Sequence, residues 1–421
     1  MTTTSDPQTT DWQIRVPNRD ELRTYAEPVR LAFGGGFSDE ELSDWLKRAE
    51  PDRWLGAFEP GSEAPAGAAS AFSMRLTVPG GEVPVAAVTG VGVRPDQRRR
   101  GILRTLMTRQ LHDVHERGEA IAVLLASEGA IYQRFGYGLA ALDAKIEVPP
   151  QQTRFLRATP QVGRVRIVDE QEARALVPRV YEVARAVTPG ALSRTEPWWN
   201  EVLGDPEYSR AGAGPKYRVV FEVDGAPEAY AVYRIRDAWD ERGPNSVLEV
   251  GEAITTTPRS VRGLWRYLFD VDLVRTVKVG HIPMPTPLQH VLVEPRALSL
   301  IARDGLWLRL VDLPAALMAR TYARADTLVL EVRDALCPWN AGRWQLRTEG
   351  PSALATATVE RTDMPADLVM DSADLSAAYL GGVRPVELAA AGRMVEATPG
   401  AALRASTLFA TEHVAWCATM F

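Results

Sequence analysis

The residues best suited to ligand chemistry lie between Val91 and Arg104, where a glycine-bearing strand runs into an arginine-rich turn. Glycines in a strand leave backbone groups open to an extended ligand. Gly101 then opens a predicted helix, whose first N–H groups are unpaired and whose dipole favours negative charge. Such a turn suits a pyrophosphate, to which Arg99, Arg100 and Arg104 would add charge-assisted hydrogen bonds. The alternative is a solvated basic loop before an amphipathic helix.

Alternating strands and helices must position this segment. The β-branched strand Val83–Val93 leads into it, and the helix after Gly101 is followed by an apolar strand, Ala120–Ala126, which we expect to be buried. This alternation predicts an α/β or α+β sheet covered by helices. We also predict strands over Trp54–Phe58 and Ala71–Val78, and helices over Pro28–Phe33 and over Asp39–Ala49 with Ser38 as N-cap.

A second region, after Pro149–Pro150, looks like an imperfect copy of the first. In both regions a strand and a proline precede arginines, a glycine and a helix, at Arg98–Arg104 and again at Arg259–Arg266. We interpret this as a degenerate internal duplication. Within the copy we expect a hairpin of strands Tyr217–Val223 and Ala229–Arg236, a strand over His290–Val293 and a small helix over Leu298–Ile301.

A third region starts near Leu310. Strands are expected at Thr327–Val332 and Trp344–Thr348, and helices at Ser372–Leu380 and Pro385–Ala391. The last residues, 414–421, are apolar and typical of a core. Most chain ends are polar and frayed, so this apolar end needs an explanation.

The composition limits the class of protein. A chain of 421 residues exceeds what one hydrophobic core usually organises, so two or three domains are expected. The net charge of −6 argues against a nucleic-acid binder. Two cysteines, Cys337 and Cys417, form no disulfide framework and fit a reducing cytoplasm. The polar N-terminus predicts no signal peptide, and no stretch approaches the roughly 20 apolar residues of a membrane span.

Two motifs of the first region together resemble a known enzyme family. Arg98-Arg-Arg-Gly101-Ile-Leu103 is similar to motif A of the GNAT (GCN5-related N-acetyltransferase) superfamily, with Leu103 in place of the usual small residue. The run Ala126–Gly138, ASEGAIYQRFGYG, follows it, and the combination resembles the enhanced intracellular survival (Eis) acetyltransferases. The Trp339-Asn-Ala-Gly turn and the Asp374–Gly382 run resemble sterol carrier protein.

The resemblance implies a fold for the whole chain. The expected class is α/β (α+β), with a catalytic GNAT domain at residues 1–150 and a degenerate GNAT-like domain at 151–309. A sterol-carrier-protein-like domain at 310–421 would deliver the C-terminal carboxylate. The resemblance also implies a homo-oligomer, a hexamer, and a small-molecule or peptide amine as substrate.

The same resemblance assigns roles to residues around acetyl-CoA, the expected cosubstrate. The backbone of Val91, Gly92 and Val93 would pair with the pantetheine arm. The pyrophosphate would be cradled by Arg99, Arg100, Gly101, Ile102, Leu103 and Arg104. Ser127 and Glu128 would border the cosubstrate. Tyr132 takes the position of the general acid, and the C-terminal carboxylate of Phe421 that of the general base.

These two roles suit amine acetylation. A tyrosine with an ordinary pKa of about 10 can protonate the departing CoA thiolate. A terminal carboxylate in an apolar site has its pKa raised by desolvation, which makes it a better base; deprotonation through water is the alternative. Without the resemblance, Tyr132 would be a packed aromatic beside Phe135 and Tyr137, and the chain end a docked strand.

Other clusters favour ordinary structural roles. His112 and His115 lie three residues apart on the predicted helix without an apparent third ligand, so we assign no metal. Two groups of residues could instead line a substrate pocket or its mouth. They are the tryptophans Trp12, Trp45, Trp54, Trp198 and Trp199, and the acidic residues Asp39, Glu40, Glu41 and Asp44. We expect the former in the core and the latter on a solvated helix face.

The leading hypothesis is an enzyme that transfers acetyl from acetyl-CoA to a primary amine on an aminoglycoside, a polyamine or lysine. We expect direct transfer, because neither cysteine lies in the cosubstrate segment. A hypothesis of another class is a non-catalytic protein that binds acyl-CoA or lipid through the sterol-carrier-like domain.

Overall fold

The segment Val91–Arg104 begins in a strand of the first sheet and continues through a turn into the helix that follows it. The computed structural model describes residues 12–35, 38–156 and 162–421. Across this sheet the strands are β1 (Gln13–Arg15), β2 (Trp54–Phe58), β3 (Gly67–Val78), β4 (Gly81–Val93), β5 (Ile121–Leu125), β16 (Leu306–Leu310) and β6 (Gly138–Leu139). β4 and β5 run parallel, and the other neighbours are antiparallel.

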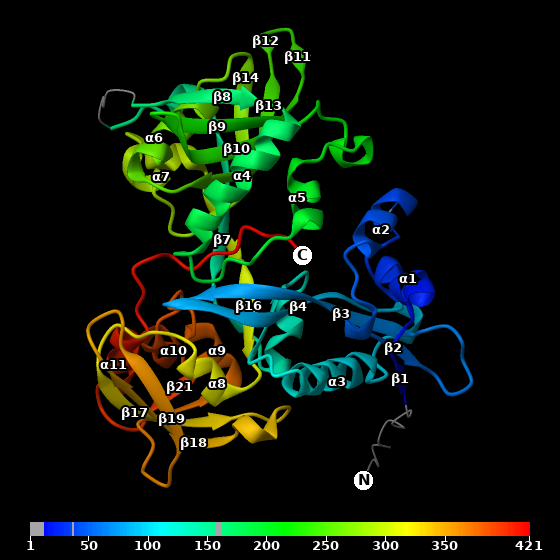
Figure 1. The fold of residues 1–421 in the computed structure, drawn as a ribbon, viewed down its shortest axis with the longest axis vertical. Helices are drawn as coiled ribbons and strands as arrows, with labels where there is room; N and C mark the ends of the chain where they lie inside the picture. Colours follow the sequence, from blue (N-terminus) through cyan, green and yellow to red (C-terminus); the bar gives the residue numbers. More distant parts are fainter. Residues whose placement is uncertain (1–11, 36–37, 157–161) are drawn as a thin grey trace, which may run out of the picture.

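Helices cover both faces of this sheet (Figure 1). α1 (Leu22–Ala32) and α2 (Asp39–Leu46) pack on the face that carries Trp54 and Phe58. α3 (Ile102–Glu116) packs on the opposite face, against Leu55 and Ala57. The period-two alternation of β2 thus presents one set of side chains to each helix layer.

The helix predictions for this region were largely correct. Ser38 caps α2 and forms a capping box with Glu41, as expected of its position. The expected apolar face of α3 is buried. The predicted helix at Pro28–Phe33 is wrong at its start, because α1 begins six residues earlier and carries Pro28 in its interior. A proline is common at a helix start, but its position alone does not identify one.

The second sheet repeats the first in outline. Its strands are β15 (Ile301–Asp304), β7 (Leu142–Val148), β14 (Val274–Pro283), β13 (Ser246–Thr255), β10 (Ala226–Arg236), β9 (Tyr217–Val223) and β8 (Arg164–Val168). Its helices are α4 (Glu170–Arg185), α5 (Glu196–Leu203), α6 (Pro258–Phe269) and α7 (Leu288–Val291). α6 follows β13 as α3 follows β4, which agrees with an internal duplication. The predicted hairpin is confirmed as β9 and β10.

Two predictions in the second region are wrong. The strand expected at His290–Val293 is the short helix α7, and the helix expected at Leu298–Ile301 is a 3₁₀ turn, Pro295–Leu298, followed by β15. Apolar runs of four residues are too short for their periodicity to separate helix from strand.

The two sheets exchange their last strands, which departs from the domain boundaries expected at residues 150 and 309. β7 belongs by sequence to the first region but lies in the second sheet, between β14 and β15. β16 belongs by sequence to the second region but lies in the first sheet, between β5 and β6. Each repeat of the duplication is therefore completed by a strand of the other.

This exchange predicts that residues 1–150 alone do not fold. Without β16, all five residues of β5 lose their partners on one side, β6 has no neighbour, and the buried residues of β7 are exposed. We expect the full chain to show a cooperative thermal transition by circular dichroism and residues 1–150 to show none. A cooperative transition of residues 1–150 would contradict the structural role of the exchange.

The third region forms a smaller sheet with its own helices. Its strands are β19 (Thr356–Arg361), β18 (Gly342–Glu349), β17 (Asp326–Arg333), β20 (Leu368–Asp371) and β21 (Met394–Glu396), and its helices are α8 (Leu313–Met318), α9 (Ser372–Ala378), α10 (Pro385–Ala390) and α11 (Ala401–Leu408). The predicted strands and helices of this region are confirmed. Among the described residues, no helix is long and apolar enough to span a membrane.

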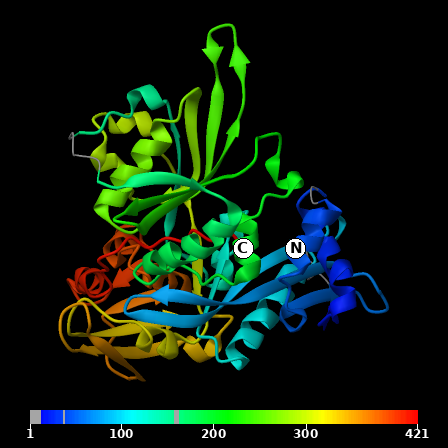
Figure 2. The ribbon, with the colours of Figure 1, turned by 45° about the horizontal axis from the view of Figure 1, so that its top comes forward.

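The last eight residues, the C-terminal segment, run between the first sheet and the second domain, by which we mean the second sheet with its helices. Figures 1 and 2 show this red segment passing below the second domain and ending near α5. It has no regular secondary structure, so the alternative of a docked strand is wrong, yet Ala415, Trp416, Cys417 and Thr419 are buried. The apolar end of the chain is thus explained by its place between two domains.

Candidate active site

The parallel strands β4 and β5 separate at the centre of the first sheet. They are paired only at Ala86–Ala122 and Ala87–Val123, although β4 continues to Val93. Beyond Ala87, β4 stays bonded to β3 on its other side. The backbone of Val88–Val93 therefore has no β5 partner among the described residues. An extended ligand can form hydrogen bonds with such an unpaired edge.

The three strand residues predicted to bind the ligand, Val91, Gly92 and Val93, lie on this edge, and Gly92 has an additional role in helix packing. Val91 and Val93 are half-buried against the cluster of Ile102 and Leu106 at the start of α3. Gly92 is buried, and a Cβ there would lie 2.6 Å from the Cα atom of Val29 in α1. The glycine at 92 is therefore required by helix packing, as well as being part of the unpaired strand.

The turn after β4 delivers the chain into an uncapped helix. Gly101 is the N-cap of α3 with a left-handed φ of 79°, and no side chain caps the first turn. Nor does that turn contain an acidic residue, although acidic residues favour helix N-termini. The free N–H groups of Ile102, Leu103 and Arg104 and the helix dipole form a site suited to phosphate.

The arginines of the turn differ in their partners. Arg100 pairs with Glu59 at 2.8 Å and stacks over Trp12, whose indole nitrogen donates to the Arg100 carbonyl. Arg99 and Arg104 are exposed and form no ion pair with any residue that the structure describes. Arg99 and Arg104 are therefore free to meet an anion, whereas Arg100 also braces the turn.

Tyr132 lies beside the ends of β4 and β5. It is buried in one hydrophobic cluster with Val88 and Leu124, and its ring is 6.0 Å from that of Tyr137. No described residue forms a hydrogen bond with the Tyr132 hydroxyl. Burial, with a smaller effect of Glu128, raises the pKa of Tyr132 to about 12. The phenol is therefore a protonated donor without a hydrogen-bond partner among the described residues.

The remaining predicted residues fall on both sides of the strand separation. Ser127 and Glu128 are exposed and follow β5 directly. Phe421 is half-buried against the cluster that contains Phe72, Ala87 and Trp198, on the face of the first sheet away from Tyr132. The gap between β4 and β5 connects the two faces of the sheet, so a ligand in the gap could be reached by Tyr132 from one face and by Phe421 from the other.

Aromatic side chains surround the face on which Phe421 packs. Phe72 of β3 meets Trp198 of α5 edge to face at 5.1 Å, and Trp45 of α2 meets Trp54 at 5.1 Å. All five tryptophans with a pocket-lining alternative are buried or half-buried. Asp44, expected on a solvated helix face, instead bonds Lys47 and the Tyr208 hydroxyl.

The second domain lacks the corresponding anion site. The N-terminus of α6 is closed by a capping box of Thr257 and Ser260, with Pro258 at its first turn. Arg259, the counterpart of the turn arginines, is ion-paired with Glu228. The Ser260 N–H of this turn is therefore already bonded to Thr257, and Pro258 has no N–H to offer a phosphate.

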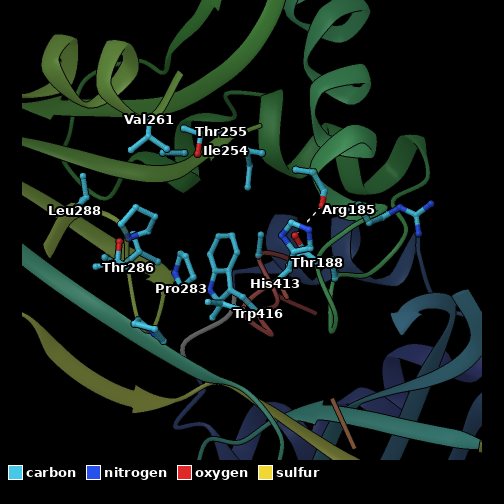
Figure 3. A pocket seen from close by; sticks show the side chains of 18 of the residues that line it. Arg185, Thr188, Ile254, Thr255, Val261, Pro283, Thr286, Leu288, His413 and Trp416 are labelled. Carbon is cyan, nitrogen blue, oxygen red and sulfur yellow. Dashed lines mark hydrogen bonds between the residues drawn. The ribbon is translucent and has the colours of Figure 1, made fainter. Parts of the chain in front are cut away.

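A cavity of about 240 Å³ remains where β13 and β14 separate (Figure 3). Ile254 and Thr255 from β13, Pro283 from β14 and Val261 from α6 form one part of its wall. The C-terminal segment forms the other, and Figure 3 shows the Trp416 indole pointing into the cavity. The second domain thus keeps the shape of the strand separation and fills part of it with the chain's own end.

The predicted histidine pair packs on Trp339, and both cysteines are buried. His115 stacks on Trp339 at 4.2 Å, and His112 meets the same ring edge to face. The described part of the chain contains no cluster of three or more potential metal ligands. Burial raises the pKa of the Cys337 thiol to about 11 and that of Cys417 to about 12.

The sequence motifs did not identify three residues that the fold brings together beside the C-terminal segment: Arg194, Glu252 and Thr419. They come from a loop, a strand and the C-terminal segment, and no local motif marks any of them. A pairing of opposite buried charges far apart in sequence gives no periodic or spacing signal.

Comparisons with known proteins follow the same division of the chain. Residues 13–140 and 190–310 each match a model described as an acetyltransferase (GNAT) domain, and residues 313–418 match a sterol carrier protein domain. The expected order of two GNAT-like domains and a sterol-carrier-like domain is therefore confirmed.

Whole-chain relatives extend the match. An uncharacterized N-acetyltransferase of Streptomyces avermitilis is 39% identical over 97% of this chain and 98% of its own length. The N-acetyltransferase Eis of Mycobacterium tuberculosis is 35% identical over 80% of both chains. The crystal structure of Eis1 from Mycobacterium abscessus matches with a TM-score of 0.83 and 34% identity, over 97% of this chain and all of that one. The chain therefore belongs to the Eis family of GNAT N-acetyltransferases.

Proposed function

We propose that this enzyme transfers the acetyl group of acetyl-CoA directly to a primary amine at the gap between β4 and β5. The observation that carries the proposal is the combination of an unpaired β4 edge with the uncapped N-terminus of α3. The first suits the amide-containing pantetheine arm, and the second suits the pyrophosphate.

Two groups of the chain are proposed to move protons during the transfer. The amine nitrogen bonds to the acetyl carbon as the carbon–sulfur bond breaks, so a proton must leave nitrogen and another must reach sulfur. Tyr132, protonated and unpartnered, would donate to the sulfur. The Phe421 carboxylate, on the opposite face, would accept the proton of the amine. The two faces of the sheet thereby separate the acid from the base.

Direct transfer is favoured over an acetyl-cysteine intermediate. A cysteine nucleophile reacts as the thiolate, which a lowered pKa provides. Burial instead raises the pKa of both cysteines here. Neither belongs to the segment between β4 and Tyr132.

The amine class is proposed to be an aminoglycoside, a polyamine or a lysine side chain. A net charge of −6 and the aromatic walls formed by Trp45, Trp198 and Phe72 favour a cationic amine with an apolar or ring-shaped body. The hexamer and the cytoplasmic location stay predictions, of which the first is checked by light scattering.

Lipid binding by the third domain is less well supported. Its inward side chains, including Leu328, Leu330 and Tyr379, form one continuous core with Phe72 and Val85 of the first sheet. Apolar surface that packs on the protein's own domains is not available to a lipid. Native mass spectrometry that detects a retained lipid or acyl-CoA would favour this second reading.

The assay that tests the proposal is release of the CoA thiol with a panel of aminoglycosides, polyamines and lysine peptides. We expect amine-dependent release for at least one class, with a matching N-acetyl product by mass spectrometry. No release above background with any member would remove the proposal.

Binding of the cosubstrate tests the anion site separately. We expect Arg99→Gln and Arg104→Gln each to weaken acetyl-CoA binding by roughly tenfold, because each removes a charge-assisted hydrogen bond to phosphate. Isothermal titration calorimetry would measure the loss, which should shrink at high salt. Arg109→Gln is the matched control, since Arg109 lies farther along α3 and pairs with Asp113. An equal loss in the control would point to a general effect of charge.

A further inference from the structure

We propose that the second domain positions the C-terminal carboxylate, by holding Thr419 in a buried hydrogen-bond network two residues before the chain ends. The inference rests on the proposed function, because the role of the Phe421 carboxylate gives the network its purpose. A domain that has lost its own phosphate site would thus serve the active site of the other.

The Thr419 hydroxyl uses both its acceptor and its donor capacity. Its residue is only 2% exposed. Arg194 Nε donates to Thr419 Oγ1 at 2.9 Å, and Tyr181 Oη lies 3.0 Å from the same oxygen. Tyr181 already donates its proton to the Leu192 carbonyl at 2.6 Å, so the Thr419 hydroxyl must donate to Tyr181. Both bonds together fix the direction of this side chain.

The partners of Thr419 are themselves fixed. Arg194 forms two parallel bonds with Glu252, at 2.9 and 2.5 Å, and its side chain is 1% exposed. Glu252 also accepts from the Tyr230 hydroxyl at 2.6 Å. The Arg194 guanidinium stacks over the ring of Tyr181 at 4.1 Å. Because Glu252 holds the Arg194 guanidinium at two points and an aromatic ring covers it, Arg194 has little freedom to move with the C-terminal segment, residues 414–421, which we call the tail.

The network is also tied to the first sheet. The segment before Arg194 bonds to β3, where Gly190 donates to the Thr77 carbonyl at 2.8 Å. The same segment receives the Trp416 N–H on the Pro189 carbonyl at 2.9 Å. Two short backbone hydrogen bonds therefore connect the tail, through residues 189 and 190, to β3, the neighbour of β4 in the first sheet.

A second contact holds the tail upstream of Thr419. The Trp416 indole nitrogen donates to Asp143 on the exchanged strand β7 at 3.2 Å, while the ring lines the cavity between β13 and β14 (Figure 3). Two anchors three residues apart restrict the segment that follows. Phe421 lies two residues after the second anchor, so the proposed carboxylate can move only a short distance from Thr419.

The direct test compares Thr419→Val with Thr419→Ser. Valine keeps the shape and removes both hydrogen bonds, whereas serine keeps both. We expect Thr419→Val to lower kcat at least about tenfold with the acetyl-CoA KM within about twofold, because a charge-assisted bond and its partner are lost. Thr419→Ser should retain most of the wild-type kcat.

A measurement independent of activity reports the tail itself. Carboxypeptidase releases Phe421 only when the end of the chain detaches from the fold. We expect faster release of Phe421 from Thr419→Val, by about tenfold or more, and a wild-type rate from Thr419→Ser. This readout tests the clamp even if acetyl transfer is not the reaction, and wild-type inactivity toward all amines would overturn only the proposed function.

Tyr233→Phe is the matched control for a general loss of stability. It removes the hydrogen bond between Tyr233 and Tyr267 in the same domain, and neither tyrosine contacts Thr419, Arg194 or Glu252 through a hydrogen bond. We expect a lower Tm with kcat and Phe421 release close to wild type. The proposal is overturned if Thr419→Val matches wild type in both readouts, or if Tyr233→Phe reproduces its effects.

Discussion

Replacing Tyr132 with phenylalanine is expected to lower kcat by roughly 100-fold or more while acetyl-CoA affinity stays within about twofold, since general acid catalysis contributes on this scale. The ring remains in its cluster with Val88 and Leu124, and only the unpartnered hydroxyl is removed. Packing and cosubstrate binding should therefore survive. Steady-state kinetics with calorimetry for affinity would separate the two effects.

Tyr137→Phe is the matched control for this prediction. The Tyr137 ring packs against that of Tyr132, and its buried hydroxyl has no hydrogen-bond partner in the part of the chain that the structure describes. Burial raises the pKa of Tyr137 further above its ordinary value. Removing that hydroxyl should leave kcat unchanged and cost no hydrogen bond. Equal losses in the two variants would refute the acid role of Tyr132.

The pH profile gives an additional check with a definite sign. The acid acts in its protonated form, and burial raises the pKa of Tyr132 from its ordinary value near about 10 to about 12. Proton donation should therefore persist as the pH passes 10 and fall only as it approaches 12. A loss of kcat that titrates near pH 10 and disappears in Tyr132→Phe would contradict the raised pKa.

Blocking the C-terminal carboxylate is expected to lower kcat by a similar factor, roughly 100-fold or more. Amidation of Phe421 by peptide ligation removes the charge and keeps the side chain that packs on the first sheet. Extension by two glycines keeps a carboxylate but moves it away from the reacting amine. Both changes should reduce turnover far more than acetyl-CoA affinity.

The control for this prediction carries the same two glycines at the N-terminus, ahead of β1 at the far edge of the first sheet. That form should keep full activity. Phe421→Ala separates charge from packing, because it retains the carboxylate and loses the ring. Full activity of the amidated enzyme would assign proton removal to water or to another group.

Local patterns in the sequence determined most of the elements and marked Val91–Arg104 as the proposed cosubstrate segment. The β-branched run of β4, the Ser38 cap of α2 and the apolar face of α3 follow from interactions between near neighbours, so they could be predicted. The motif around Gly101 likewise indicated an anion site, because a helix N-terminus is a local structure. The order of the three domains followed from family resemblance.

Only the tertiary structure decided which sheet each strand completes and what holds the chain end. The apolar alternation of β7 and β16 would fit either sheet. The exchange therefore depends on strand partners at least 129 residues apart, the separation of Val148 and Val277. Glycine at 92 was explained by the approach of α1, and Thr419 gained its partners from Arg194 and Tyr181. Backbone pairing and buried charge complementarity act between distant segments, and a single sequence carries no spacing signal for them.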